Sequence, residues 1–316
     1  MREAIPDVKY MRFECNVFLI FFAIWILCGC QSSRPLLSEK ENSFVPVEIK
    51  IKQASDPQKI SPEERQNLRE WLSVFYRGPK KKEWKEAREK ILKIGPVGTE
   101  AICIFMLKFF YGGKKKTALQ DRDEDVAKYW EQAKEELLYL KDDAVPYILY
   151  TMSHPSLGST GRMLCSQTLV KIGKPAVEPL IQNIEKGPRA FQRIVMDTLS
   201  KIGHPIASIA IAELYLRLPL PKQSIVEESQ EDDTFDLRFS AIKALGVLAS
   251  HDGLKAIEKA LDDPNPLVAK EAFKAILNYN EEECIPALKK ALEKTKHPEY
   301  VGYAKKIERK LFLLEQ

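Results

Sequence analysis

The sequence predicts an all-α fold, an α-solenoid of about six stacked helical hairpins that occupies residues 61–316. Three observations predict it. Small and aliphatic residues recur along this part of the chain in six copies at helical spacing, and turns with glycine and proline follow several of the copies. Glycine is scarce, at 14 of 316 residues, while long stretches are rich in Ala, Leu, Lys and Glu, which favour helix over sheet. A single hairpin cannot bury its apolar face alone, so the copies must stack on one another.

The N-terminal segment, residues 1–29, is predicted to be a secretory signal peptide. Residues 17–27 form an unbroken apolar run, VFLIFFAIWIL, preceded by Lys9 and Arg12. The run is shorter than the roughly 20 residues that a bilayer-spanning helix needs. It fits the apolar region of a secretory signal, whose basic side stays in the cytoplasm. Met11 could be the true start, which would leave a compact signal.

Residues Leu27-Cys28-Gly29-Cys30 resemble the lipobox of bacterial lipoproteins, in which an aliphatic and two small residues precede an obligatory cysteine. The resemblance implies cleavage before Cys30, diacylglycerol on its thiol and an acyl chain such as palmitate on the new amino terminus. The alternative is an ordinary signal peptide that ends in two cysteines. Two or three acyl chains anchor a protein firmly, so we expect a lipoprotein of the cell envelope that faces the periplasm. In Gram-negative lipoproteins an Asp after the cysteine favours the inner membrane, so Gln31 favours the outer membrane.

Residues 30–60 are predicted to be a flexible tether. They are polar and interrupted by Pro35, Pro46 and Pro57. About 30 flexible residues reach on the order of 30 Å, so the folded domain would float near the membrane rather than lie on it. The alternating residues 47–51 could form a short strand, but one strand without a partner stays loose.

The repeat consists of three columns of residues in six copies. The small first column predicts places where helices approach closely. The first column is Ala87, Ala133, Cys165, Val195, Ala241 and Ala272. The second column, four residues later in each copy, is Ile91, Leu137, Leu169, Leu199, Leu245 and Ile276. The third column, three residues after the second, is Ile94, Leu140, Ile172, Ile202, Leu248 and Tyr279.

The turns and two inserts divide the repeat. Gly95, Gly173 and Gly203 are each followed by a proline, which predicts a helix end and the start of the second helix of the hairpin. First-column residues are separated by 46, 32, 30, 46 and 31 positions, so about 15 extra residues enter twice. The first insert contains Lys114–Lys116 and the second the acidic run 227–236. Both join a second helix to the next first helix, so both are predicted to emerge along one edge. Further helices are expected near 61–76 and 299–314.

The stretch Leu237-Arg238-Phe-Ser-Ala-Ile-Lys-Ala-Leu-Gly246 resembles the short HEAT repeat of the type first seen in phycobilisome lyases. Arg162 fits the same motif, while Gln192 replaces the arginine in the fourth copy and Ala269 in the sixth. The resemblance covers about residue 61 to the C-terminus and implies a HEAT-like α-solenoid, which we expect to be right-handed. Such repeats serve enzymes and scaffolds alike, so the function stays open.

The residues that could carry chemistry are few. His154, His204, His251 and His297 all fall at predicted turns, where turn or cap roles are expected and metal ligation is the alternative. HEAT-like enzymes with a di-iron centre use His-Glu pairs, and no His-Glu dipeptide occurs here. Besides Cys30, the mature chain would hold three cysteines without metal-ligand spacing, which we expect to be structural rather than redox-active or bilin-bound: Cys103, Cys165 and Cys284.

The function predicted from the sequence is a membrane-anchored periplasmic scaffold for protein–protein interaction or assembly. We expect protein partners, a membrane contact through Cys30, and no catalytic residue, cofactor, metal or small-molecule substrate. The main alternative is an enzyme or enzyme subunit of the lyase or modification type, with polar catalytic residues on the concave solenoid face. A third, DNA binding as in HEAT-like glycosylases, conflicts with export and with a net charge of only +4. The concave face and the inserts are the expected binding surfaces; the lysine runs 80–82 and 114–116 could meet anionic lipid, peptidoglycan or an acidic partner, or be simply solvated.

Overall fold

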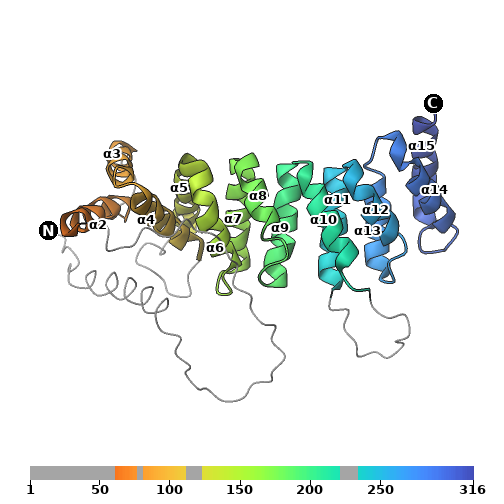
Figure 1. Ribbon diagram of the computed structural model, residues 1–316, viewed down its shortest axis with the longest axis horizontal. Helices are drawn as coiled ribbons and strands as arrows, with labels where there is room; N and C mark the ends of the chain where they lie inside the picture. Colours follow the sequence, from red (N-terminus) through yellow and green to blue (C-terminus); the bar gives the residue numbers. More distant parts are fainter. Residues whose placement is uncertain (1–60, 77–80, 112–122, 221–233) are drawn as a thin grey trace, which may run out of the picture. The chain divides into compact units, whose positions relative to one another are not determined.

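The computed structural model describes residues 61–76, 81–111, 123–220 and 234–316 (Figure 1). The predicted signal peptide, Cys30, the tether and the middle of both inserts lie outside the described residues. All described residues belong to one compact unit, residues 44–316. They form helices and turns, and none of them lies in a strand. The all-α prediction is therefore confirmed.

Within the described ranges the helices pair into the six predicted hairpins. Helix α2 (Pro62–Tyr76) precedes the hairpins and α15 (Ala304–Leu314) follows them, close to the two predicted terminal helices. The first helices are α3 (Lys81–Leu92), α5 (Asp123–Leu140), α7 (Ser159–Ile172), α9 (Arg189–Ile202), α11 (Phe235–Leu248) and α13 (Pro266–Ile276). The second helices are α4 (Pro96–Leu107), α6 (Val145–Ser153), α8 (Val177–Ile181), α10 (Ile206–Arg217), α12 (Leu254–Ala260) and α14 (Ile285–Lys294).

The hairpins stack into two layers of helices. From α5 to α13, each first helix packs on the next first helix, and from α4 to α14 each second helix packs on the next second helix. Helix α2 packs on α3 and α4, and α15 packs on α14. In Figure 1 the helices accordingly follow one another in chain order. We call the two layers of helices the first-helix layer and the second-helix layer.

The predicted columns form the core between the layers. No residue of the first two columns is more than 3% exposed, which confirms the register. In the third column only Leu140 and Tyr279 are buried, because this column lies next to the turn at the helix end. Small residues also allow close approach, since a Cβ atom on Gly246 of α11 would lie 2.7 Å from the Cβ of Ala275 on α13.

A left-handed residue ends the first helix in five of the described hairpins. Gly95, Gly173 and Gly203 have φ angles of 84°, 76° and 73°. Positive φ angles are common directly after a helix, and glycine adopts them without a steric cost. Lys141 and Ala249 occupy the same position with φ angles of 50° and 46°. These two were not predicted, because neither residue type favours the left-handed region.

In the second, third and fourth hairpins, the first-helix residue three positions before the first column donates a hydrogen bond to the preceding hairpin. The indole of Trp130 donates to the Phe109 carbonyl at 3.0 Å. Nε and Nη2 of Arg162 donate to the carbonyls of Met152 and His154 at 3.2 and 3.1 Å. The amide of Gln192 donates to the carbonyl of Glu185 at 3.2 Å and to that of Gly187 at 3.1 Å. The accepting carbonyls lie in the last turn of a second helix or in the segment that follows it.

Candidate functional site

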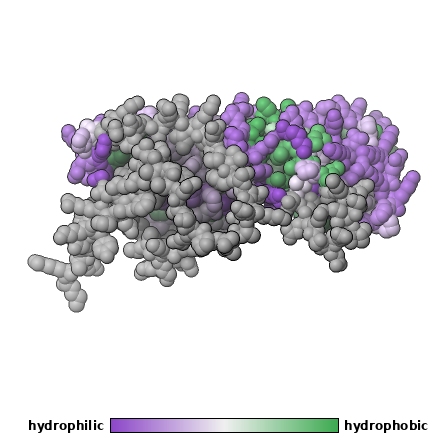
Figure 2. All heavy atoms as spheres, turned by 60° about the horizontal axis from the view of Figure 1, so that its bottom comes forward, coloured by the Kyte–Doolittle hydropathy of each residue, from purple (hydrophilic) through white to green (hydrophobic). Residues whose placement is uncertain are grey.

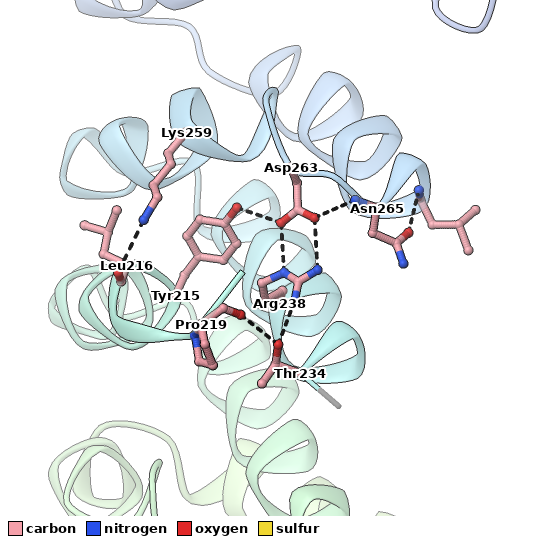
Figure 3. Close-up of polar contacts among 9 residues, drawn as sticks. Tyr215, Leu216, Pro219, Thr234, Arg238, Lys259, Asp263 and Asn265 are labelled. Atoms are coloured by element: carbon pink, nitrogen blue, oxygen red, sulfur yellow. Dashed lines mark hydrogen bonds and ion pairs between the residues drawn. The ribbon is translucent and has the colours of Figure 1, made fainter. Parts of the chain in front are cut away.

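A buried ion pair joins the fifth and sixth hairpins (Figure 3). Arg238 on α11 donates from Nε to Oδ2 of Asp263 at 2.9 Å and from Nη2 to Oδ1 at 3.0 Å, and neither side chain is exposed. Asp263 also accepts from the hydroxyl of Tyr215 on α10 at 3.1 Å and from the backbone N–H of Asn265 at 3.0 Å. Burial and the charge of Asp263 raise the pKa of Tyr215, so its hydroxyl stays a donor.

The same cluster closes the base of the acidic insert. Thr234 accepts a hydrogen bond of 2.6 Å from Nη1 of Arg238 and donates one of 3.0 Å to the carbonyl of Pro219 (Figure 3). Pro219 lies near the start of the insert and Thr234 at its end. The charges of this cluster face one another inside the protein, away from any substrate. We therefore assign it a structural role.

A second polar cluster lies between α3 and α5. Glu136 accepts from the indole of Trp84 at 2.8 Å and pairs with Nη1 of Arg88 at 3.1 Å. The Arg88 guanidinium also lies 3.6 Å from the ring centre of Tyr139. Burial raises the pKa of Glu136, although Arg88 and Trp84 oppose the shift. This cluster attaches the first hairpin to the second, and it was not predicted from the sequence.

The histidines and cysteines lie where the sequence predicted. His154 and His204 follow helix ends, His251 begins a 3-10 turn, and His297 lies in the turn after α14. The Nδ1 atom of His154 is 2.7 Å from the hydroxyl of Ser156, as expected for a turn residue. Among the described residues, no group of three or more His, Cys, Asp or Glu side chains is arranged to hold a metal ion.

The three cysteines of the described chain belong to the core. Cys103, Cys165 and Cys284 are fully buried and free of disulfides. Burial raises the pKa of each thiol, which keeps it protonated and a poor nucleophile. The predicted structural role of these cysteines thus agrees with their packing.

The second-helix layer presents apolar side chains to solvent. Ile206 and Ile209 on α10 are each 44% exposed, and a spacing of three residues places them on one side of the helix. Ile104 on α4 is 36% exposed, and Tyr147 and Tyr150 on α6 are half-buried. Figure 2 shows a hydrophobic area among hydrophilic surface on the face that it presents. Ile206 and Ile209, which lie together on α10, are defined here as the apolar face.

Ion pairs replace apolar residues farther along the second-helix layer. Lys290 on α14 lies 2.8 Å from Asp262 and 3.8 Å from Glu258, which belong to the preceding hairpin, and Lys294 also pairs with Asp262. Burial alone would raise the pKa of Asp262, but hydrogen bonds from Lys290 and Lys294 outweigh it and lower that pKa. These ion pairs join α14 to α12 and to the turn that follows α12.

Some of the site residues predicted from the sequence lie outside the residues that the structure describes. Cys30, the proposed lipidation site, lies outside the described residues, as do Lys80 and Lys114–Lys116. Both inserts join a second helix to the next first helix as expected, since the first links α4 and its following 3-10 turn to α5 and the second links α10 to α11. The predicted acidic run 227–236 extends into α11, which begins at Phe235. The apolar face was not predicted from the sequence, where the concave face and the inserts were the expected binding surfaces.

Comparison with known proteins identifies the repeat. Residues 223–302 match the family described as HEAT repeats. No curated protein matches the chain. A crystal structure of an engineered protein from the Northeast Structural Genomics Consortium aligns with 80% of this chain and 98% of its own, at 15% identity and a TM-score of 0.28. Of the described helices, none has the length and apolar character to cross a membrane. The chain thus carries HEAT repeats over residues 223–302 within an all-α, HEAT-like solenoid.

Proposed function

We propose that this protein is a non-catalytic scaffold that binds other proteins at the cell envelope and is held to a membrane through a lipid on Cys30. The apolar face is the observation that carries the binding part of the proposal. Large apolar side chains that lie together on a solvent-facing surface are typical of protein-binding sites. Here Ile206 and Ile209 project from a helix whose other side is packed into the core, so the surface is preformed.

The internal polar clusters support a scaffold over an enzyme. A general acid or base has to come within hydrogen-bond reach of its substrate. Arg238 and Asp263 bond to each other and to neighbouring protein groups, with no exposed side-chain surface. Arg88 and Glu136 pair in the same way between two helices, with little exposure. Such groups stabilise the stack rather than meet a ligand.

The binding surface can be tested by in vivo crosslinking with a matched pair of variants. Ile206→Glu/Ile209→Glu places two charges on the apolar face, while Val247→Glu places one on α11 of the first-helix layer, where Val247 is 59% exposed. We expect the first variant to lose its crosslinked partners and the second to keep them, with unchanged circular dichroism for both. Equal crosslinking of wild type and both variants would remove the apolar face as the binding surface.

The anchor can be tested by membrane fractionation. Cys30→Ala removes the thiol that the lipobox resemblance marks for lipidation, so this variant should leave the membrane fraction or accumulate uncleaved. Cys28→Ala is the control, because alanine is also a small residue and leaves the lipobox pattern intact. If Cys30→Ala fractionates and migrates like wild type, Cys30 is not the modified residue.

A further inference from the structure

The solvent-facing side of α15 carries cations and apolar side chains together. Ile307 and Leu311, four residues apart, are buried against the rest of the stack. Lys305, Arg309 and Phe312 recur at i, i+4 and i+7, which places them on one stripe on the opposite side of the helix. All three are exposed, Phe312 to 63%. We call this stripe, with its neighbours Lys306 and Leu313, the outer face of α15.

The apolar part of this face is unusually exposed. Leu313 is 60% exposed, and Val301, in the 3-10 turn that leads into α15, is 63% exposed. With Phe312, they are the most exposed large apolar side chains in the described part of the chain. A group of this kind costs free energy in water unless another surface covers it.

The charge on α15 is strongly positive. Residues Ala304–Leu314 contain four cations, Lys305, Lys306, Arg309 and Lys310, against one carboxylate, Glu308, a balance of +3. Just beyond the helix, Glu315 pairs with Lys289 of α14 at 2.9 Å and so does little to offset these cations. The partner that fits is therefore negative at its surface and apolar beneath it.

We propose that the outer face of α15 binds an anionic lipid surface. Lys305, Lys306 and Arg309 would meet the headgroup phosphates, while Phe312 and Leu313 enter the boundary between headgroups and acyl chains. Amphipathic helices with basic residues beside Phe and Leu bind membrane surfaces in this manner, and each cation near an anionic surface adds to the binding. A purely anionic ligand would leave Phe312 and Leu313 uncovered, and a purely apolar partner would leave the cations unmatched.

The use of this contact in the cell rests on the proposed anchor. A short helix with two apolar contacts binds a membrane weakly by itself. In a chain already held by a lipid on Cys30, the same contact becomes intramolecular, and its effective concentration rises into the millimolar range. The solenoid would then lie on the membrane part of the time instead of hanging from the tether.

Co-sedimentation with vesicles tests the proposal. The protein for this test is residues 44–316, the compact unit that holds the core of the described chain and lacks the apolar run 17–27, which would itself enter vesicles. Without the anchor we expect weak but measurable binding to phosphatidylcholine vesicles that contain a quarter phosphatidylglycerol, and this binding should fall as salt screens the charges. Lys305→Glu/Arg309→Glu should weaken it about tenfold or more. Phe312→Ser/Leu313→Ser should also weaken it, by roughly three- to tenfold.

Matched controls test whether the position of these residues on α15, rather than the total charge or apolar surface of the protein, determines vesicle binding. Lys171→Glu/Lys243→Glu makes the same charge change at exposed positions of α7 and α11, and Val247→Ser removes an equally exposed apolar side chain. Both controls should bind vesicles like the unmodified fragment. Equal losses in the controls, or no preference for phosphatidylglycerol, would overturn the proposal.

Self-association would overturn the proposal in a different way. If sedimentation velocity without vesicles shows dimers that Phe312→Ser/Leu313→Ser abolishes, the outer face of α15 is an interface between copies of the chain. The test is independent of the anchor, because the fragment lacks Cys30. A negative result with Cys30→Ala therefore leaves the vesicle result standing, and the reverse also holds.

Discussion

Arg238 and Asp263 form a two-point ion pair in which neither side chain has any exposed surface. Removing two charges from water is costly, and the pair offsets this cost only because its remaining hydrogen-bonding capacity is met by Tyr215, Thr234 and the backbone of Asn265. The pair links α11 to the start of α13 and, through Tyr215, to α10.

Breaking this pair on one side should destabilise the protein severely. Arg238→Met leaves the Asp263 carboxylate buried without a cation, which we expect to lower the free energy of unfolding by about 3–5 kcal/mol in urea melts. The control is Arg193→Met, which breaks an exposed pair with Asp236 of 3.1 Å and should cost less than about 1 kcal/mol. The double variant Arg238→Met/Asp263→Asn should be more stable than Arg238→Met alone. If Arg238→Met and Arg193→Met lower the free energy of unfolding by similar amounts, the buried pair stabilises the protein no more than the exposed one.

The core of the fold was predictable because its signal is periodic. The columns headed by Ala87 and Ile91 repeat along the chain, and burial of every member follows from stacking alike hairpins. The donor position was only half predictable. Arg162, Gln192 and Arg238 stand out in the sequence, whereas Trp84 and Trp130 share their position and were not recognised. An indole N–H donates as a guanidinium does, so the shared property is the donor and not the residue type.

The candidate surfaces were less predictable, because exposure depends on which side of each helix meets its neighbour. Ile209 and Ile211 are both apolar residues of α10, yet Ile209 is 44% exposed and Ile211 is fully buried. Periodicity alone does not separate them in a helix that is apolar on nearly every side. On α15 the alternation of Lys305, Ile307, Arg309 and Leu311 is visible in the sequence, but only the packing on α14 shows which stripe remains outside.

Glycine at position 249 should stabilise the protein. Ala249 follows α11 with a φ angle of 46° and a left-handed conformation, which costs an L-residue with a Cβ atom about 1 kcal/mol or more. Part of the gain from Ala249→Gly is lost to the greater entropy of glycine in the unfolded chain, so we expect a net increase of about 0.5 kcal/mol. Thermal and urea melts measure it. Gly203→Ala, at the equivalent position of the fourth hairpin, should do the opposite. Destabilisation by Ala249→Gly would contradict this reading of the turn.

The stability of the protein should depend on pH through Glu136. Burial raises the pKa of this carboxyl group above its usual value of 4.5, so the folded state binds the proton more tightly than the unfolded state does. Stability then falls as pH rises from the pKa of Glu136 in the unfolded state to its raised pKa in the folded state. Above the folded-state pKa, the contribution of Glu136 to stability no longer changes with pH. Glu136→Gln removes the titration and keeps an acceptor for Trp84. We expect the unfolding free energy of wild type minus that of the variant to fall as pH rises. Urea melts from pH 4 to 8 measure it, an interval on the order of the shifts that burial causes. A rising difference would mean that Arg88 outweighs burial.

Shortening the acidic insert should leave the fold intact. Its two ends are joined by the hydrogen bond from Thr234 to the Pro219 carbonyl at 3.0 Å, and Thr234 is in turn held by Arg238. Replacing residues 221–233 with about four glycine and serine residues shortens the closed loop, and loop-closure entropy predicts a small stabilisation, on the order of 1 kcal/mol or less. Thr234→Val keeps the insert but removes both hydrogen bonds, and leaving such groups without a partner costs about 1–3 kcal/mol. Melting curves should therefore rank the shortened protein at or above wild type and Thr234→Val below it. The reverse order would show that the insert itself, rather than its hydrogen-bonded base, supports the fifth hairpin.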